Sequence, residues 1–304
     1  NSIDIKIITN SREKLSYSRP TCFLCTPIMA KRKIKELITN VDILLFDEAH
    51  HVAAKVFSEI WIEYTKIDNK KPIISLGLSA TPFRNTYEEQ LELEKAFDNN
   101  LIITKQLGLK PIEKLIANGV LSKPIFKKID GIPEIYYHKG FADKRKLFDL
   151  VLIKERWYAI LKCIIKEKDK QLIVFCINKE HGISLVKQLR FFSESAEYVD
   201  SDTDIKLRVG IFERFNQNKT RILVNVSLVV EGVDCPSADG IVLTYPIMSK
   251  IKLKQIFGRV LRGNALGGTE NGYIYSIEGS QEWLENILYK EKIIESNWKN
   301  IEFS

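Results

Sequence analysis

The chain has 304 residues, of which 45% are hydrophobic and 28% are charged, and its formal net charge is +7. This mixture is typical of globular proteins and excludes a disordered or fibrous chain, and no apolar run approaches the roughly 20 residues that span a bilayer. The length suits two domains, and the mildly basic balance permits a polyanionic partner without demanding one.

The first third of the sequence alternates short Ile/Val/Leu runs with helical patterns, as βα units on a parallel sheet do. The pattern predicts strands near 4–8, 22–25, 42–46 and 73–78 and helices near 29–39, 52–65 and 86–98. Polar or turn clusters follow three of these strands, at 26–27, 47–48 and 79–82. Because ligands of open α/β sheets bind beyond the carboxyl ends of the strands, we expect these clusters to converge.

A second series begins near residue 150. It predicts strands at 171–177, 196–199, 221–226, 240–244 and 272–276 and helices at 150–167, 179–192, 204–217 and 250–262. Between the two series, residues 119–145 hold several Gly and Pro residues with little periodicity, which is typical of a connector. The sequence therefore predicts an α/β fold with two tandem parallel-sheet domains. Its divisions are a first domain 1–122, a connector 123–145, a second domain 146–277 and a helical tail 278–304.

Two adjacent carboxylates, Asp47 and Glu48, follow the apolar run 41–46 directly. Such a pair at a strand end suits phosphate chemistry, because one carboxylate can anchor Mg²⁺ through water while the next orients a nucleophilic water. Taken alone, such a pair on a loop is more often a solvated turn.

Three further elements strengthen the interpretation as phosphate chemistry. They are Ser79-Ala80-Thr81-Pro82 after the next strand, Glu231-Gly232-Val233-Asp234 in the second series, and the stretch from Gln255 to Arg262. Gln255, Arg259 and Arg262 stand at i, i+4 and i+7, which predicts that they share one face of a helix. A solvated basic face explains the arginines alone equally well.

In order and spacing, these elements resemble the superfamily 2 helicases and translocases, whose two RecA-like domains sandwich ATP. The resemblance assigns Asp47–His50 to motif II, Ser79–Thr81 to motif III, Glu231–Asp234 to motif V, Gln255–Arg262 to motif VI and Cys25–Pro27 to motif Ib. Arg208 with Phe215 resembles the arginine and phenylalanine of another helix of the family. The stretches DEAHH, GLSATPFR, LIANGVLSKP and QIFGRVLRG look most like restriction-enzyme motor subunits and related DNA translocases.

The resemblance implies roles for individual residues. Asp47 would hold Mg²⁺ through water, Glu48 would act as the general base, and His50 would couple the nucleotide state to the second domain. Arg259 and Arg262 would act as arginine fingers on the γ-phosphate. The other residues that the family implies are Gln255, Gly232, Asp234, Ser79 and Thr81 around the nucleotide, and Thr26, Arg84 and Ser227 on the nucleic-acid backbone. Motif V departs from the pattern, because Val226 stands where a Thr is usual.

The family's phosphate-binding loop, G-x-x-x-x-G-K-[ST], does not occur in residues 1–304, which contain no Gly-Lys dipeptide. Residue 1 is Asn, and a βα unit with this loop needs roughly 30 more residues. We therefore expect the unit to lie upstream, and we expect residues 1–304 alone to be inactive as an ATP hydrolase.

Together the motifs predict an ATP- and Mg²⁺-dependent DNA helicase or translocase, in restriction, phage defence or repair. Two alternatives stay open: a hydrolysis-dead scaffold subunit with the same fold, and an RNA helicase. The carboxylates and arginines weigh against the scaffold, whereas the preference for DNA rests on the resemblance alone. The tail 278–304 has an apolar helical pattern that would suit docking on the second domain or on a partner subunit.

The five cysteines are an odd number, and Cys22-x-x-Cys25 has no second Cys or His pair to complete a zinc site. For Cys22 and Cys25 the sequence therefore favours two small residues on a buried strand over a zinc or redox site. Cysteine usage and the lack of a membrane span predict a reducing, cytoplasmic location.

Overall fold

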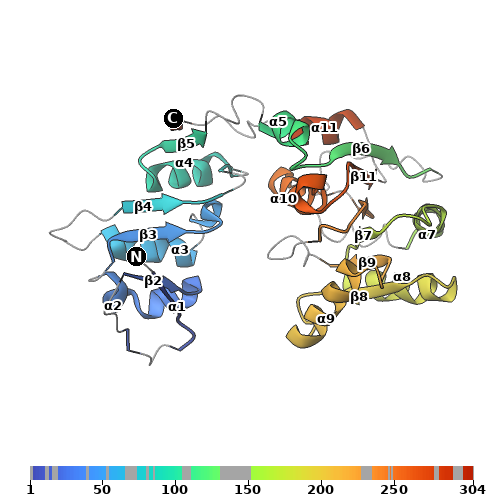
Figure 1. The fold of residues 1–304 in the computed structure, drawn as a ribbon, viewed down its shortest axis with the longest axis horizontal. Helices are drawn as coiled ribbons and strands as arrows, with labels where there is room; N and C mark the ends of the chain where they lie inside the picture. Colours follow the sequence, from blue (N-terminus) through green and yellow to red (C-terminus); the bar gives the residue numbers. More distant parts are fainter. Residues whose placement is uncertain are drawn as a thin grey trace. The chain divides into compact units, whose positions relative to one another are not determined.

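The computed structural model describes residues 3–10, 14–15, 20–38, 41–52, 55–65, 74–79, 82–84, 86–104, 111–130, 152–226, 235–245, 247, 249–276, 281–289 and 297–303. The chain forms two compact units (Figure 1). Unit 1 combines Asn1–Thr104 with Lys292–Ser304, and unit 2 is Lys105–Glu291. No helix in the described part of the chain is long and apolar enough to cross a bilayer.

Unit 1 alternates strands and helices. Its elements are β1 (Asp4–Ile7), β2 (Thr21–Leu24), α1 (Pro27–Arg32), α2 (Ile34–Ile38), β3 (Ile43–Phe46), the 3₁₀ turn η1 (Ala49–His51), α3 (Lys55–Thr65), β4 (Ile74–Gly77), α4 (Tyr87–Ala96), β5 (Asn100–Thr104) and β12 (Lys299–Phe303). The pairings among its described strands are parallel: β1 with β2, β3 with β4, and β5 with β12. The strands predicted near 4–8, 22–25, 42–46 and 73–78 are confirmed.

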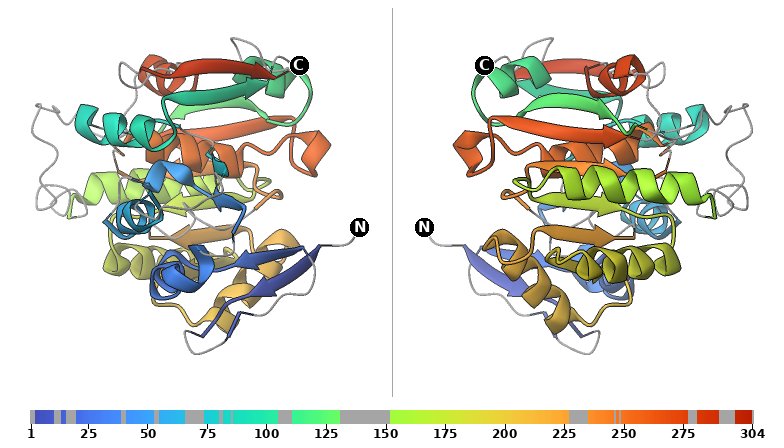
Figure 2. Two further views of the ribbon diagram at one scale, coloured as in Figure 1. Left: turned by 90° about the vertical axis from the view of Figure 1, so that its left-hand side faces the viewer. Right: turned by 90° about the vertical axis from the view of Figure 1, so that its right-hand side faces the viewer.

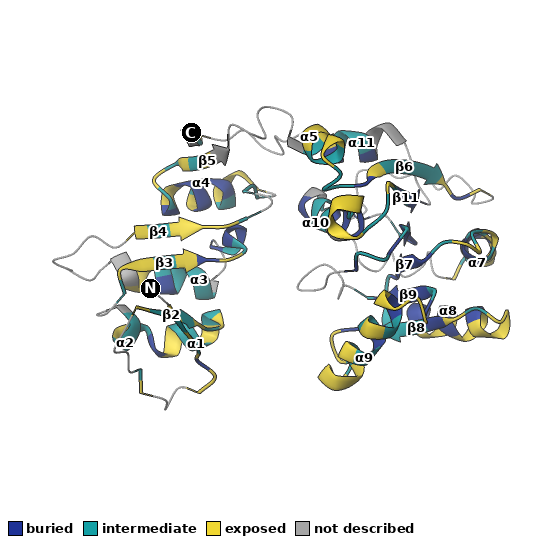
Figure 3. Ribbon diagram, viewed as in Figure 1, coloured by how far each residue is buried: buried dark blue, intermediate teal, exposed yellow. Residues whose placement is uncertain are grey.

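The two faces of these strand pairs differ in burial, because successive side chains of a strand point to opposite faces. One face packs on helices around a core of Phe46, Ala49, Val52, Ile60, Leu93 and Ala96. The opposite face exposes between 38% and 68% of Ile5, Ile7, Leu24, Ile43, Leu45, Ile74 and Leu76, and Figure 3 shows β3 and β4 largely in the colour of exposed residues. Cys22 is exposed too, so the prediction that Cys22 and Cys25 lie on a buried strand is wrong for Cys22.

Unit 2 is built on one six-stranded sheet. Its elements are α5 (Pro111–Ala117), β6 (Lys123–Lys128), α7 (Lys154–Lys166), β7 (Leu172–Phe175), α8 (Lys179–Phe191), β8 (Ala196–Val199), α9 (Ile205–Asn216), β9 (Ile222–Asn225), β10 (Gly240–Leu243), α10 (Lys250–Val260), the 3₁₀ turn η2 (Asn264–Leu266), β11 (Asn271–Ser276) and α11 (Gln281–Tyr289). The strand order is β6-β11-β10-β7-β9-β8, and every pairing is parallel. All carboxyl ends therefore lie at one edge of the sheet.

Helices cover both faces of this sheet, as a parallel sheet requires. Helices α7 and α8 pack on one face, against Leu172 and Val174 of β7, and lie in front of the strands in the right-hand view of Figure 2. Helices α9, α10 and α11 pack on the other face, against Ile173 and Phe175. All four residues of β7 are at most 1% exposed. Burial of each such side chain stabilises the fold by about 1.5–3 kcal/mol.

Helices α8, α9 and α10 of unit 2 begin where the sequence supplies a side-chain oxygen for the free backbone N–H groups of the first turn. Asn178 accepts from the N–H of His181 at 2.8 Å, and Ser249 accepts from that of Lys252 at 3.2 Å. Asp204 does the same for the first turn of α9. These caps explain why the predicted helix starts agree with the structure within a few residues.

The compact units divide the chain differently from the sequence. Residues 123–128, predicted as connector, form the edge strand β6, because they pair with β11 along its whole length. The predicted helical tail contains α11 in unit 2 and then β12, which pairs with β5 of unit 1. The domain boundaries at 122, 145 and 277 stay a prediction about functional division.

Candidate functional site

The loop after β3 carries the two adjacent carboxylates. Strand β3 ends at Phe46, which is 6% exposed and anchors the loop in the core of unit 1. Asp47 is exposed, and its Oδ1 accepts the backbone N–H of Glu48 at 2.9 Å. Glu48 has φ 50° and ψ 48°, the left-handed region that a side chain with a Cβ seldom occupies. The chain thus turns sharply directly after the strand and places the two carboxylates at its carboxyl end.

His50 connects this loop to the loop after β4. It is 1% exposed, and its Nδ1 lies 3.0 Å from Ser79 Oγ and 3.3 Å from Glu48 Oε2. Burial, with the electrostatic influence of His51 and of the Arg84 guanidinium as smaller causes, lowers the pKa of His50 to about 4. The ring is therefore neutral at pH 7, when one ring nitrogen donates a hydrogen bond and the other accepts one.

Backbone hydrogen bonds hold the two loops together. The N–H of Leu78 donates to Phe46 O, and the N–H of Ala49 donates to Leu78 O, both at 2.8 Å. The sequence predicts convergence of the clusters after β3 and β4, and this part is confirmed for Asp47, Glu48 and Ser79. The third cluster has a local role in the structure: Thr26 caps α1, and its hydroxyl accepts the N–H of Met29 at 3.4 Å.

Arg84 supports the same loop from within unit 1. Its Nη1 donates to the carbonyl oxygen of His50 at 3.0 Å, and its Nε and Nη2 lie 3.1 Å and 3.0 Å from Glu89 Oε2. The resemblance assigns Arg84 to nucleic acid, and that role stays a prediction. The supporting role was missed, although Thr86-x-x-Glu89 is a helix-start pattern that places Glu89 in the first turn of α4.

In unit 2, the apolar side of α10 is as the sequence predicts, with Ile256, Phe257, Val260 and Leu261 at most 2% exposed. The prediction that Gln255, Arg259 and Arg262 share one face of a helix is wrong for Arg262. Helix α10 ends at Val260, and Arg262 lies beyond it in an antiparallel bridge with Leu121. Gln255 is half-buried on the helix, and the backbone of Arg259 belongs to the helix.

Several candidates fall on parts of the chain that the structure does not describe. Thr81, Gly232, Asp234 and Ser227 lie outside the described residues, as does the side chain of Arg259.

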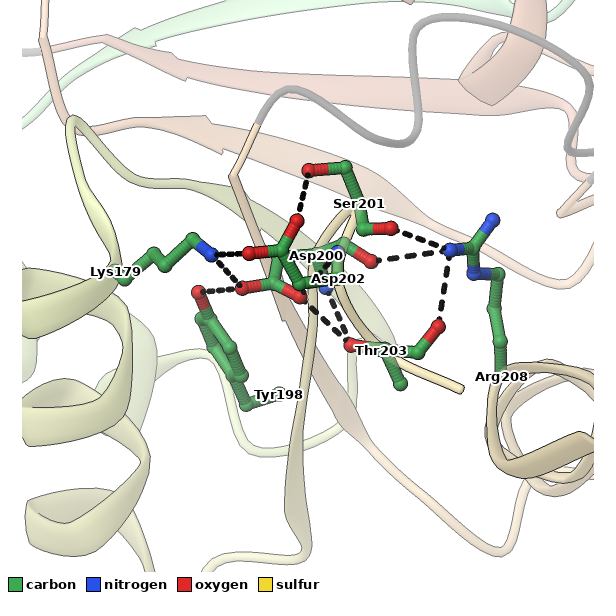
Figure 4. Close-up of polar contacts among 7 residues, drawn as sticks. All are labelled: Lys179, Tyr198, Asp200, Ser201, Asp202, Thr203 and Arg208. Atoms are coloured by element: carbon green, nitrogen blue, oxygen red, sulfur yellow. Dashed lines mark hydrogen bonds and ion pairs between the residues drawn. The ribbon is translucent and has the colours of Figure 1, made fainter. Parts of the chain in front are cut away.

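A polar cluster at the carboxyl end of β8 contains Arg208, the arginine that resembles the family's (Figure 4). Its Nη2 donates to the carbonyl oxygens of Ser201 at 2.9 Å and of Thr203 at 3.0 Å, and lies 3.5 Å from that of Asp200. Burial opposes ionisation of Asp200, but hydrogen bonds from Thr203, Tyr198 and Lys179 outweigh it and hold its pKa below the ordinary value. In this structure Arg208 therefore fixes the loop that leads into α9.

Asp47 is the residue that the family resemblance assigns to Mg²⁺. Its exposed carboxylate at a strand end fits an ion that keeps several of its waters, as Mg²⁺ does. Within the described ranges, no three His, Cys, Asp or Glu side chains are grouped as a metal cage.

Comparison with known proteins matches each unit in turn. Residues 2–84 match the family described as type III restriction enzyme, res subunit, and residues 155–264 match the helicase conserved C-terminal domain. Putative helicase 22 of Sulfolobus islandicus filamentous virus is 28% identical over 284 residues, which are 88% of this chain and 48% of the viral protein. Putative ATP-dependent helicase IRC3 of Saccharomyces cerevisiae is 28% identical over 239 residues, 76% of this chain and 33% of the yeast protein. The chain thus spans half or less of the length of these relatives.

Solved structures share the fold. A fragment of a putative HsdR subunit of a type I restriction enzyme from Vibrio vulnificus aligns with 99% of this chain and 57% of its own, with a TM-score of 0.67 and 20% identity. Saccharomyces cerevisiae Dbp5, solved with RNA and ADP BeF3, aligns with 99% of this chain and 70% of its own, with a TM-score of 0.53 and 10% identity. The predicted α/β fold of two tandem RecA-like domains is confirmed. The family match on each unit and the helicases among its relatives support the resemblance of this chain to the superfamily 2 helicases and translocases.

Proposed function

We propose that this protein belongs to a motor that hydrolyses ATP to move on DNA. The observation that carries the proposal is the cluster at the carboxyl ends of β3 and β4, where His50 Nδ1 lies within 3.3 Å of both Glu48 and Ser79. These contacts link the proposed base Glu48, the neutral ring of His50 and the loop after β4 that carries Ser79. The helicase relatives support an ATP-driven activity on nucleic acid in general.

In the proposed reaction, Glu48 accepts a proton from the attacking water. Asp47 would hold Mg²⁺ through water, and the ion when bound neutralises charge on the phosphates. His50, kept neutral by burial, transmits a change at Glu48 to Ser79 through hydrogen bonds rather than through a change of charge.

The arginines complete the proposal. Arg259 and Arg262 supply cationic, planar donors to the γ-phosphate, with Gln255 beside them. The remaining assignments rest on the family resemblance: Thr81, Gly232 and Asp234 near the nucleotide, and Thr26, Arg84 and Ser227 near the nucleic-acid backbone. Protein partner subunits remain part of the proposal, as does a cytoplasmic location, for which the five free cysteines are supporting evidence.

We favour DNA over RNA because the match of residues 2–84 is to a restriction-enzyme subunit. An RNA helicase and a hydrolysis-dead scaffold are the alternatives. ATP turnover by the full-length protein, stimulated more by duplex DNA than by duplex RNA, distinguishes the three. Turnover stimulated by RNA favours the RNA helicase, and no turnover favours the scaffold.

The experiment that tests the base is Glu48→Gln in the full-length protein. Loss of a general base should lower ATP turnover by about 10²-fold or more, whereas binding of the nucleotide persists. Glu92→Gln makes the same change at an exposed carboxylate of α4 and should leave turnover unaltered. Unchanged turnover in Glu48→Gln would remove Glu48 from the mechanism.

A separate part of the proposal concerns residues 1–304 by themselves, which contain no Gly-Lys dipeptide. Without a lysine and a loop of N–H groups around the β- and γ-phosphates, these residues should bind ATP weakly. Titration with a labelled ATP analogue measures this, and micromolar affinity would contradict it.

A further inference from the structure

Two segments of unit 2 that are far apart in the sequence lie against each other around Arg262. One is residues 119–122, between α5 and β6, and the other is residues 261–270, between α10 and β11. We call the two segments together the clasp. Both are within unit 2, and the second carries the arginine that the proposed function places on ATP.

Main-chain hydrogen bonds join the two segments along their length. The N–H of Gly263 donates to Val120 O at 3.0 Å, that of Ala265 to Gly119 O at 2.9 Å, and that of Ser122 to Leu261 O at 3.1 Å. Leu121 and Arg262 face each other as an antiparallel bridge pair. The path of the chain on both sides of Arg262 is therefore fixed by residues 119–122.

Ser122 contacts the main chain of Arg262 directly. It is 1% exposed, and its Oγ lies 2.6 Å from the carbonyl oxygen of Arg262 and 2.6 Å from that of Thr269. The single hydroxyl proton can serve either carbonyl, so the hydroxyl binds both sides of the loop that starts at Arg262. The N–H of Thr269 also donates to the carbonyl oxygen of Arg262, at 2.9 Å.

The clasp also depends on two glycines for its close approach. A Cβ at Gly263 would lie 2.1 Å from the carbonyl oxygen of Gly119, and a Cβ at Gly268 would lie 1.9 Å from that of Arg262. No side chain fits at these distances. Because these two positions are glycines, the loop after α10 can lie close to residues 119–122. There the carbonyl oxygen of Arg262 is contacted by Ser122 and by the N–H of Thr269.

We propose that Ser122 is a positioning residue for Arg262: its hydroxyl fixes the main chain at Arg262 and so sets the direction in which the guanidinium leaves the loop. The inference rests on the proposed role of Arg262 in ATP hydrolysis. Ser122 touches no substrate itself. Its effect comes through the orientation of a group whose contribution to rate depends steeply on placement, since about 1 Å of misplacement can cost roughly 10² in rate.

The test is a double-mutant cycle in the full-length protein, with ATP turnover at saturating nucleic acid as readout. Ser122→Ala removes the hydroxyl, and Ser122→Cys replaces it with a larger and weaker donor, so it serves if the alanine variant does not fold. We expect either variant to lower kcat about tenfold or more with little change in KM for ATP. Ser195→Ala is the control, because it removes a serine hydroxyl that donates to a backbone carbonyl of Lys219 elsewhere in unit 2. It should leave kcat unaltered.

The second arm combines Ser122→Ala with Arg262→Lys. If Ser122 acts through the guanidinium, the double variant should be no slower than Arg262→Lys alone, because there is no longer a guanidinium to position. If the losses of kcat in the two single variants multiply in the double variant, Ser122 acts independently of Arg262 as a packing residue, and the inference is overturned. Normal kcat in Ser122→Ala, with an impaired Arg262→Lys, would overturn it too and leave the proposed function intact. Normal turnover in Arg262→Lys would overturn the inference together with the proposed role of Arg262, and would leave ATP hydrolysis itself intact.

Discussion

His181 should remain neutral well below the pH at which histidine ordinarily takes up a proton. The residue is in the first turn of α8, 3% exposed, with its ring 5.2 Å from that of Trp157. Burial, with the nearby Arg156 guanidinium as a second cause, lowers the pKa of His181 to about 4. Among the described residues, its Nδ1 has no hydrogen-bond partner that would favour the protonated form.

The pKa difference fixes the sign and size of a stability change. In the unfolded chain His181 binds a proton near pH 6.5, but in the folded chain only near pH 4. As the pH falls from 7.5 to 5, the unfolded state therefore gains a proton that the folded state does not. The free energy of unfolding should fall by about 2 kcal/mol from this residue alone.

Comparison of the wild type with His181→Gln isolates this contribution. Urea unfolding, followed by tryptophan fluorescence at pH 7.5 and pH 5, should show a loss about 2 kcal/mol larger in the wild type. The histidine resonances in NMR spectra give the pKa directly. Arg156→Met removes the second cause and should shift the pKa of His181 upward. Equal pH dependence of the two proteins, or a His181 pKa near 6.5 in the folded chain, would refute the reasoning.

Three shorter predictions concern packing, capping and binding. Gly240→Ala places a Cβ 2.5 Å from Tyr273 O, so it should lower the free energy of unfolding by about 1–3 kcal/mol. Gly258→Ala is the control, because its Cβ would have no neighbouring atom within 4 Å and should not lower that free energy. Denaturant titration compares the two variants. Asp204→Ala removes the oxygen that accepts from Lys206 and Leu207 and should lower the midpoint of urea unfolding by the equivalent of about 1 kcal/mol, unlike Asp204→Asn. Affinity for duplex DNA, measured by fluorescence anisotropy, should fall steeply with rising salt and vary little with sequence; a salt-independent affinity would count against backbone contacts.

The sequence predicts the central strands of unit 2 well because they are buried on both faces. Such strands consist of continuous apolar runs that end at turns, and β7, β9 and β10 have this pattern. Strand β6 was missed because its six residues contain only Pro124, Ile125 and Phe126 between lysines. It is a strand because it pairs with β11, more than a hundred residues later, and such a distant partner is not visible in local periodicity. Strand β12 was missed for the same reason.

The candidate site was predicted in part. Asp47, Glu48 and Ser79 each follow a predicted strand. Because the carboxyl ends of parallel strands lie at one edge of a sheet, the sequence predicts correctly that these residues are neighbours. The end of α10 could not be predicted, since it depends on contacts with residues 119–122 rather than on the helix itself. Periodicity continued through Arg262, whereas the backbone leaves the helix at Leu261, where the N–H of Ser122 binds the carbonyl oxygen.

The left-handed backbone at Glu48 has a consequence for how this protein can change. A residue with a Cβ in that conformation stores about 1 kcal/mol of strain, which asparagine or glycine would largely relieve. Selection for thermal stability alone would therefore replace Glu48, and the proposed general base would be lost with it. At Glu48, a substitution that raises stability should lower turnover. A screen for thermally stable variants that omits an activity assay would therefore enrich inactive protein.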